Sequence, residues 1–427
     1  MMLAMGFLEK TENEERNQFR SCDQMALMWC NGAISATKRK TGLGFHIVNR
    51  LRFRGLITNK CSLVRTMAEF ELGHPSLVPK GLEAATFLPA TVHLNGAGAI
   101  DVLHKIRQRG LYLIKPGYSD CGKGIVLYRS DGSLSSLITS LATNYPGYTH
   151  KDLVLQKYIE NPLLLEGKKF DLRVFLLVVP NQRRDTGVYA FVHPGYARLA
   201  CRAYDINSDD LTLHLTNQAV QHRDRTYKNV KEATVWSPDS LNSYLNQHMA
   251  ELKVPCTDWV RRRLYPRIRA ILGHVTSIVS SSLCDEPFSY ELFGCDFLVD
   301  ADFNVWLLEV NSDPSLNKST QVLRQIVSQV VEESVALAVE VLQRAARGLP
   351  VKGLATQQDF RKFLPNAFQT WTNYSSSRRR PKYTPSYKRA KQCKNDAFLV
   401  LNFYCDNCFF LAETVAFVII QSSYILM

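Results

Sequence analysis

Short apolar runs separated by turn-forming residues fill the middle of the chain and predict β-strands. They are Leu111–Lys115, Gly124–Tyr128, Leu153–Lys157, Leu172–Val179, Gly187–Val192, Asp296–Val299 and Phe303–Val310. Two longer segments, Trp259–Ser280 and Gln321–Arg347, repeat apolar residues every three or four positions and predict helices. The second pattern stops at Gly348 and Pro350, which commonly follow the end of a helix.

The two ends of the chain differ from this middle part. Residues 1–23 are polar and acidic and are expected to be disordered, and 24–100 mix short apolar runs with turn residues. Residues 350–396 are expected to form a disordered basic linker, because eight Lys and Arg and no acidic residue lie between Asn373 and Asn395. Residues 397–427 are apolar, and their role stays open between a membrane anchor, an additional packed segment and an irregular chain end.

The composition narrows the class of protein only slightly. The chain has 427 residues, 46% hydrophobic and 21% charged, which excludes wholesale disorder. A net charge of +13 predicts a polyanionic partner, and nucleic acid, an anionic membrane and an acidic protein tail fit it equally. No secretory signal is recognised, and eleven cysteines without a repeated spacing indicate reduced thiols in the cytosol. The lone Cys405-x-x-Cys408 does not suggest a metal site.

A glycine-rich segment is the first sign of chemistry. Gly117-x4-Gly122-Lys123 nearly matches a P-loop, but Gly124 stands where the metal-binding hydroxyl is needed, and a strand follows instead of a helix. A glycine-rich turn between antiparallel strands can fold over phosphates, with Lys115 and Lys123 supplying charge. A plain hairpin turn with a surface lysine is the alternative.

Two further strands carry polar groups. Leu153–Lys157 leads into a Pro-containing linker whose backbone could pair with an adenine edge, with Tyr158 and Ile159 beside the ring, although a buried strand and turn would look the same. Lys169, Asp171 and Arg173 share one face of the next strand. Burying three charges is costly unless that face lines a polar cleft, and a solvated sheet face is the alternative.

The strongest chemical pattern is a predicted hairpin near residue 300. Asp296 near the start of one strand and Glu309 near the end of the other come opposite each other, and Asn311 points to the same face as Glu309. Two carboxylates and an amide oxygen are hard ligands that suit Mg²⁺ bridging nucleotide phosphates. Ordinary turn and cap chemistry is the alternative.

Taken in order, these segments resemble the ATP-grasp ligases, specifically the tubulin–tyrosine-ligase-like family. The likeness rests on KPGYSDCGKGI, LQKYIENPLLL, KKFDLRVFLLV, YARLACRAYD, HLTN and FGCDFLVDADFNVWLLEVNSDPSL, and weakly on residues 56–60. Within the family, HPGYARLACRAYD, DLTLHLTNQAVQ and residues 230–237 resemble the polyglycylase branch. The resemblance implies an α+β fold. A small N-terminal α/β domain (24–100) would precede a central lobe (101–160) and a C-terminal lobe (161–349), whose antiparallel sheets grip ATP.

The resemblance also implies roles for individual residues. ATP contacts fall on Lys115, Gly122, Lys123, Gln156, Lys157, Tyr158, Ile159, Lys169 and Asp171. Mg²⁺ ligands fall on Asp296, Glu309 and Asn311, and substrate carboxylates fall on Arg173, Arg198 and Asn217. Of these, Arg173 and Glu309 are the expected catalytic residues.

The reaction that the resemblance implies is a ligation. A carboxylate on an acidic protein tail is activated as an acyl phosphate, and the amine of free glycine attacks it. The expected partners are glutamate-rich tails of tubulin, microtubules and other acidic proteins, with no specific nucleic acid and no firm membrane association. We expect a monomer in the cytoplasm and cytoskeleton, including the cilium or axoneme. A polyglutamylase and an inactive microtubule-binding relative remain the alternatives.

Overall fold

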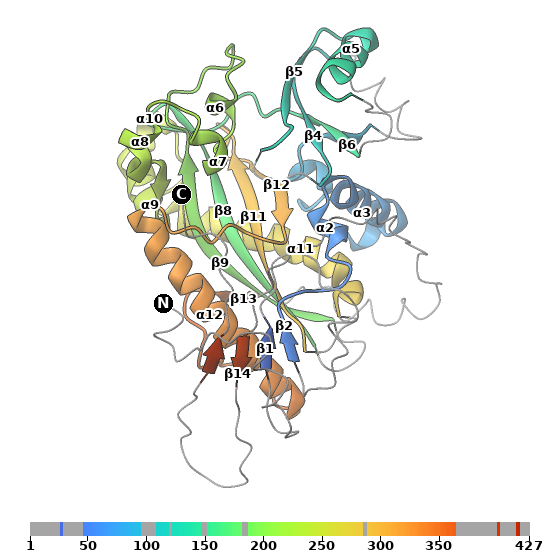
Figure 1. Ribbon diagram of the computed structural model, residues 1–427, viewed down its shortest axis with the longest axis vertical. Helices are drawn as coiled ribbons and strands as arrows, with labels where there is room; N and C mark the ends of the chain where they lie inside the picture. The colour runs from blue at the N-terminus through green and yellow to red at the C-terminus, as the bar shows by residue number, and fades with distance from the viewer. Residues whose placement is uncertain are drawn as a thin grey trace, which may run out of the picture.

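The computed structural model describes residues 26–28, 46–94, 108–118, 122–146, 152–181, 187–284, 288–363, 399–401 and 416–418. In this part of the chain the strands form three sheets, and helices cover the largest of them on both sides (Figure 1). Three expected features lie outside the described residues: the N-terminus 1–23, the basic run at 373–395, and residues 119–121 at the centre of the glycine-rich turn 117–124, called the lid below.

The central lobe is a four-stranded antiparallel sheet in the order β3-β6-β4-β5. Its strands are β3 (Thr91–His93), β4 (Gly110–Pro116), β5 (Val126–Ser130) and β6 (Leu153–Lys157). Helix α5 (Leu134–Asn144) packs on one face through Leu137 and Leu141. The strands predicted at 111–115 and 153–157 are therefore confirmed. Strand β3 joins this sheet, although its residues come before 101 in the sequence.

The C-terminal lobe is built on a sheet of seven strands. The order is β10-β9-β8-β11-β12, with β7 beside β8 and β13 beside β9. Their bounds are β7 (Leu164–Leu165), β8 (Lys168–Pro180), β9 (Val188–Leu199), β10 (Val235–Trp236), β11 (Glu291–Val299), β12 (Val305–Asn311) and β13 (Arg361–Phe363). Neighbouring strands in this sheet run antiparallel.

Two long helices cover the two faces of this sheet (Figure 1), and both correspond to helices that the hydrophobic patterns predict. Helix α11 (Tyr265–Leu283), preceded by a π-helical turn at Val260–Leu264, packs on the face of β8 that carries Leu172, Val174 and Leu176. Helix α12 (Gln321–Ala346) covers the other face, with Phe175 and Leu177. Strand β8 is apolar on both sides along most of its length because both faces are covered.

The remaining helices are short and lie around these two lobes. Helices α2 (Gly55–Thr58) and α3 (Lys60–Gly73) pack against α11, where the rings of Phe70 and His274 lie 5.8 Å apart. Asn59 caps α3 by accepting a hydrogen bond from the Ser62 N–H. The segment between β9 and α11 carries α6 (Leu211–His214), α7 (Gln218–Gln221), α8 (Tyr227–Val230), α9 (Pro238–Gln247) and α10 (Met249–Leu252). Short 3-10 turns complete the set at Pro75–Leu77, Ala84–Thr86 and Lys231–Thr234.

The start of the expected linker is ordered, which corrects the sequence-based boundary at 350. Residues 351–363 fold back on the C-terminal lobe, Phe360 is fully buried, and β13 pairs with β9. The physical reason is a buried carboxylate: Glu333 on α12 accepts hydrogen bonds from the backbone N–H groups of Gln358, Asp359 and Phe360. The sequence pattern misses this contact because it joins residues about 25 positions apart.

Two short stretches of the apolar tail are strands. Strands β14 (Leu399–Leu401) and β15 (Ala416–Val418) extend a sheet with β1 (Ala26–Met28) and β2 (His46–Val48), in the order β15-β14-β1-β2. Among the described helices, none combines the length and hydrophobicity needed to span a membrane. The pairing fits the interpretation of the tail as an additional packed segment.

Candidate active site

A pocket lies where the central lobe faces the C-terminal lobe. Strands β4 and β6 line it on one side, and β8, β11 and β12 line it on the other. It contains most residues that the sequence assigns to nucleotide binding: Lys115, Gly122, Gln156, Lys157, Tyr158, Ile159, Lys169 and Asp171. Asp296, Glu309 and Asn217 line it as well. Segments far apart in the sequence therefore converge at one place.

Lys115 is buried in the pocket lining, and a chain of polar contacts holds its side chain in place. Its ammonium donates to Oε1 of Gln156 at 2.6 Å, and the Gln156 amide donates to Oγ1 of Thr91 at 3.0 Å. Neighbouring strands position the two side chains, since Gln156 on β6 pairs with Leu113 on β4. Burial lowers the pKa of Lys115 to about 8, because removing the ammonium from water destabilises its charged form.

Lys169 is a second buried ammonium. It donates to the Tyr158 hydroxyl at 2.8 Å and lies 4.2 Å from the centre of that ring. The hydroxyl in turn bonds to Nδ1 of His214 at 2.8 Å, which holds the tyrosine in place. Burial lowers the pKa of Lys169 to about 7, although Asp171 opposes the shift.

Neither buried lysine has a carboxylate within ion-pair distance among the residues that the structure describes. A buried lysine without an ion-pair partner favours its neutral form, and a bound anion would raise its pKa and restore the charge. The two lysines face the same pocket, so a polyphosphate placed there would supply the missing charge. This arrangement fits the predicted role of Lys115 and Lys169.

Charged side chains form a row across the sheet of the C-terminal lobe. Arg198 on β9 donates to both carboxylate oxygens of Asp171 on β8, at 2.7 and 2.6 Å. Arg173, two residues further along β8, donates to both oxygens of Asp296 on β11, at 2.6 and 3.1 Å. Arg198 also lies 2.9 Å from Asp296. The strand register brings them together, because Asp171 is opposite Arg198 and Asp296 is opposite Arg173.

This row explains how three charges can share one face of a buried strand. Lys169, Asp171 and Arg173 are each about 5% exposed, so a solvated sheet face is excluded. Burial alone would raise the pKa of Asp296, but Arg173 and Arg198 outweigh it and hold that pKa well below its usual range. Asp296 is therefore ionised and fixed.

Two glycines make room for Arg173. Gly195 has a φ of +67°, and a Cβ there would lie 1.7 Å from the carbonyl oxygen of Arg173. The register of β8 and β9 shifts at this point, between Arg173 and Phe175. A Cβ on Gly294 of β11 would lie 3.2 Å from the Arg173 side chain. A side chain at Gly195 would therefore collide with the Arg173 backbone, and one at Gly294 would crowd the Arg173 side chain and Pro314, whose Cβ would lie 2.8 Å away.

Glu309 stands at the far end of the row and differs from Asp296 in its partners. It is opposite Asp296 in the register of β11 and β12, as the predicted hairpin requires. Its Oε2 lies 3.1 Å from the ammonium of Lys60 on α3, and its Oε1 accepts from the Asn311 amide at 3.1 Å. Each carboxylate oxygen can accept more than one contact, so Asp296, Glu309 and the Asn311 amide oxygen fit the hard-oxygen donor set of Mg²⁺.

Some predicted site residues do not line the pocket. Lys123 belongs to the lid and is exposed. Arg173, Arg198 and Asn311 also lie outside the lining, although the two arginines bind Asp171 and Asp296, which belong to it. Lys157 lines the pocket, yet its ammonium turns to Glu160 and to the Leu111 carbonyl.

Sequence reasoning missed several lining residues. Lys60 is a different case: the sequence places it in the weakly similar segment 56–60 without a firm role, and no local pattern connects it with Glu309. Two apolar lining residues could have been predicted from strand alternation. Leu113 and Leu298 lie two residues from Lys115 and Asp296 and therefore on the same strand faces. The remaining ones are Pro89, Ile125, His214, Leu215, Thr216 and Leu308.

Comparison with known proteins gives the family of this chain. The model of the tubulin-tyrosine ligase family matches residues 47–347, and the chain belongs to that family. The match covers the central lobe and nearly all of the C-terminal lobe. The predicted α+β fold of the ATP-grasp ligases and the predicted family are confirmed.

Similar proteins within the family carry names of glycine-adding enzymes. The chain is 32% identical to protein polyglycylase TTLL10 of Rattus norvegicus over 382 residues, which are 85% of this chain and 55% of the rat protein. It is 35% identical over 377 residues to a human protein named inactive polyglycylase TTLL10, covering 82% of this chain and 54% of that protein. It is 30% identical over 251 residues to tubulin glycylase 3B of Drosophila melanogaster, covering 56% and 31%. The chain spans about half the length of the TTLL10 relatives.

Proposed function

We propose that this chain is an ATP- and Mg²⁺-dependent ligase that adds glycine to glutamate side chains, or to growing glycine chains, on acidic protein tails such as those of tubulin. The observation that carries the proposal is the pair of buried ammonium groups, Lys115 and Lys169, that face one pocket without a carboxylate partner among the described residues. The names of the polyglycylase relatives support glycine as the added amino acid.

The lysines would bind the nucleotide phosphates. Gly122 lines the pocket from the lid, and its φ of +71° is one that glycine adopts without strain, so the lid backbone can approach the phosphates closely. Gln156, Lys157, Tyr158 and Ile159 form the segment where the adenine would lie. Asp171 and the exposed Lys123 complete the proposed nucleotide contacts.

Asp296, Glu309 and Asn311 would hold Mg²⁺. The bound ion would neutralise charge where phosphate and acceptor carboxylate meet. Glu309 is the key ligand because it lines the pocket and is partly exposed, with Lys60 on one carboxylate oxygen and the Asn311 amide on the other. Asp296, fixed by two arginines, would set the position of the ion.

The two arginines would also receive a substrate carboxylate. Each guanidinium has five N–H donors, and the described ion pairs use Nε and Nη2 of Arg173 and Arg198. The remaining Nη1 groups, with the Asn217 side chain in the pocket lining, are the proposed contacts for the carboxylate of glycine or of the acceptor. Positive charge there would orient the acceptor carboxylate toward the terminal phosphate and favour the acyl phosphate.

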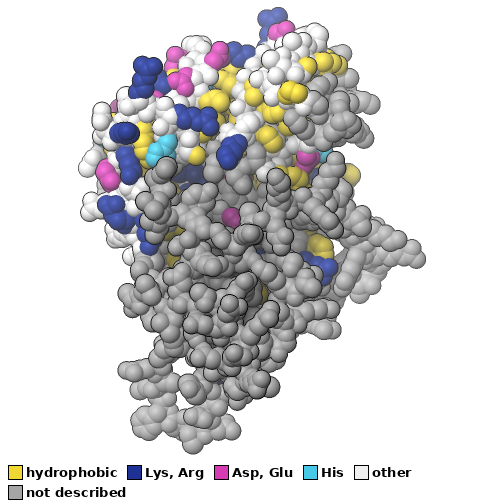
Figure 2. All heavy atoms as spheres, in the orientation of Figure 1, with side chains coloured by type: hydrophobic (Ala, Val, Ile, Leu, Met, Phe, Trp, Pro, Cys, Tyr) yellow, Lys and Arg dark blue, Asp and Glu magenta, His cyan; other side chains and the backbone are white. Residues whose placement is uncertain are grey.

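An exposed basic cluster offers a path for the acidic tail. Arg223, Arg225 and Lys228 are exposed between α7 and the end of α8, a few residues beyond the pocket-lining Asn217. Lys and Arg side chains are prominent on the surface around these helices (Figure 2). A glutamate-rich tail would be steered to such a surface at a rate that falls with salt. The partners proposed are tubulin and microtubules, and the place of action is the cytoplasm and cytoskeleton, including cilia.

The test is transfer of labelled amino acid. The purified chain is incubated with Mg²⁺-ATP, unmodified or pre-glycylated acidic tails, and labelled glycine or glutamate, and mass increments on the tails are measured. Glycine increments are expected. Glutamate increments would support the ligase reaction but show that glutamate, not glycine, is the added amino acid. Nucleotide binding with no increment on any acceptor would instead favour an inactive relative, as one human homologue is named.

A further inference from the structure

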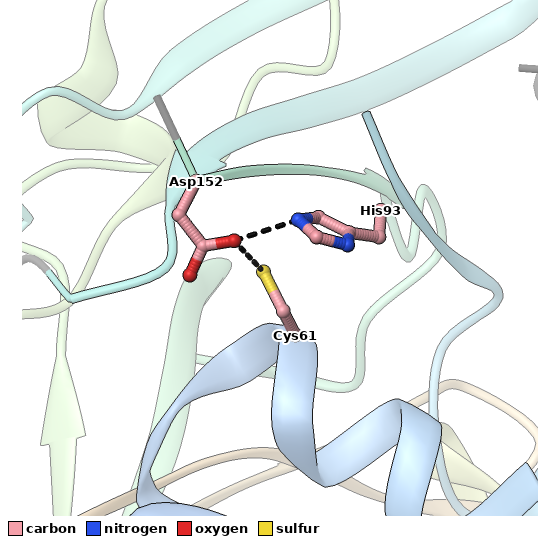
Figure 3. A group of neighbouring side chains, drawn as sticks. All are labelled: Cys61, His93 and Asp152. Carbon is pink, nitrogen blue, oxygen red and sulfur yellow. Dashed lines mark hydrogen bonds and ion pairs between the residues drawn. The ribbon is translucent and has the colours of Figure 1, made fainter. Parts of the chain in front are cut away.

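A cysteine, a histidine and an aspartate meet outside the pocket just described. Cys61 lies in the first turn of α3, His93 ends β3, and Asp152 directly precedes β6. Oδ1 of Asp152 lies 2.6 Å from Nε2 of His93 and 3.2 Å from Sγ of Cys61 (Figure 3). One potential ligand atom from each of the three side chains lies within 4.8 Å of the others.

The order of contacts argues against a catalytic triad. A cysteine nucleophile needs a histidine beside its sulfur to take the proton, with the acid behind the histidine. Here the carboxylate lies between the two, so Asp152 faces the thiol directly. Burial, and then the charge of Asp152, raise the pKa of Cys61, which keeps the free thiol protonated and unreactive. A disulfide is not formed either, because the cysteines with described side chains are free thiols.

We propose that Cys61, His93 and Asp152 form a site for Zn²⁺. Thiolate, imidazole and carboxylate are the three ligand types that zinc takes in proteins, at about 2.0–2.3 Å. A tetrahedral ion separates such ligands by about 3.5 Å, so shifts of less than about 1 Å would admit it. The ion displaces the thiol proton to solvent, and the thiolate and carboxylate charges then balance its two positive charges.

The surroundings of the cluster support a binding site. The other oxygen of Asp152 accepts a hydrogen bond from the Asn59 amide at 3.2 Å, and such contacts commonly orient the side chains that bind zinc. His93 and Asp152 are about one-third exposed, which gives an ion a way in, while Cys61 is buried beneath them. A thiolate in the first turn of α3 is also favoured by the helix dipole.

The site would link two parts of the candidate active site. Lys60, next to Cys61, contacts Glu309, and Gly117 at the start of the lid donates its N–H to the Asp152 carbonyl at 2.7 Å. A Cβ on Gly117 would lie 2.5 Å from the Asp152 carboxylate, so the lid begins directly against the cluster. Bound zinc would hold α3, β3 and the base of the lid together.

The experiment is zinc binding by the full chain. Metal-free protein is titrated with Zn²⁺ against a chromogenic chelator, and with Co²⁺ as a spectroscopic substitute. We expect one Zn²⁺ per chain from this site, a thiolate-to-cobalt charge-transfer band and release of one proton. Cys61→Ser and His93→Ala should weaken binding by more than the roughly 10–100-fold that loss of an outer-shell partner costs. His93→Ala is the safer variant for folding, since the ring is partly exposed, and circular dichroism checks both.

The controls separate this site from others. Cys256→Ser should leave zinc binding unchanged, and so should the double variant Cys405→Ser/Cys408→Ser. Glu309→Gln should also retain zinc, which keeps the result independent of the proposed ligase. Wild-type protein that binds no zinc would overturn the proposal. The proposal would also be overturned if Cys61→Ser and His93→Ala bound zinc as tightly as the wild-type protein, or if only the Cys405→Ser/Cys408→Ser variant lost zinc.

Discussion

The ammonium of Lys60 lies 3.1 Å from Oε2 of Glu309, so a helix of the N-terminal region completes the charge pattern at the end of the β11–β12 hairpin. A cation that binds Glu309 must compete with this lysine. The contact therefore makes Glu309 the point at which the N-terminal helices meet the proposed metal ligands of the C-terminal lobe.

Replacing Glu309 by glutamine removes the charge and keeps the shape. We expect amino-acid transfer to fall by on the order of 10²–10³ or more, since one preorganised charge at a reacting centre contributes that much. The fold should be intact because Glu309 is only partly buried. Mass increments on acidic tails provide the measurement, and Glu251→Gln, an exposed residue of α10, is the control. Unchanged turnover in Glu309→Gln would remove the metal assignment.

The buried ammonium of Lys169 predicts opposite effects of pH on affinity and stability. Since its pKa is about 7 in the folded protein, the charge that attracts phosphate is lost above that pH, and nucleotide affinity should fall. The unfolded chain keeps the proton up to its ordinary pKa of 10.5, so it binds more protons between these values, and the free protein should gain stability as pH rises.

Calorimetric titration with a non-hydrolysable nucleotide across this pH range checks the prediction for Lys169. Lys169→Met should bind weakly at every pH and show a flatter profile. Lys168→Met, which changes the neighbouring half-buried lysine, should keep the wild-type profile. An affinity in the wild-type protein that does not change between pH 7 and 9 would be inconsistent with the assignment of Lys169 as a phosphate ligand.

Gly195→Ala tests the bulge that aims Arg173. The added Cβ meets the Arg173 carbonyl at a φ of +67°, so we expect a loss of on the order of 1–3 kcal/mol in the free energy of unfolding, and reduced transfer activity. Gly167→Ala is the matched control, because Gly167 has a φ of +70° with open space around it. Denaturant unfolding of the two variants measures the difference: Gly167→Ala reports backbone strain alone, and Gly195→Ala reports strain together with the steric clash. Equal losses in the two variants would mean that contact with Arg173 is unimportant.

Glu333→Ala tests the docking of residues 351–363. The carboxylate accepts three backbone N–H groups, and leaving them unpaired should cost at least about 1.5–3 kcal/mol. The segment should become sensitive to limited proteolysis near Phe360. The neighbouring Glu332→Ala should change neither property. Protection of the segment in Glu333→Ala would show that the buried Phe360 holds it alone.

Reversing the charge of Arg223, Arg225 and Lys228 tests the proposed path of the acidic tail. The triple glutamate variant should bind glutamate-rich peptides more weakly, with a shallower dependence on salt, while nucleotide affinity stays the same. Fluorescence anisotropy at several salt concentrations measures this. Lys253→Glu on the exposed turn after α10 is a single-charge control. Wild-type affinity in the triple variant would place the tail elsewhere.

Local patterns predicted the strands and both long helices, because alternation and helical spacing reflect which side of each element is buried. The pairing of Asp296 with Glu309 followed from the hairpin, and its register is confirmed. Contacts between distant segments could not be predicted in this way. The ion pair of Lys60 with Glu309, the bidentate contact of Arg198 with Asp171 and the docking of Phe360 depend on tertiary packing, which no sequence period records.

In the proposed reaction, the chain activates a glutamate carboxylate with ATP before glycine attacks. The most direct test uses an acceptor peptide whose glutamate carboxylates carry ¹⁸O, with mass spectrometry of the released phosphate. An acyl phosphate passes one labelled oxygen to phosphate for each amide bond formed, and we expect that ratio. Amide formation with unlabelled phosphate would exclude an acyl phosphate intermediate.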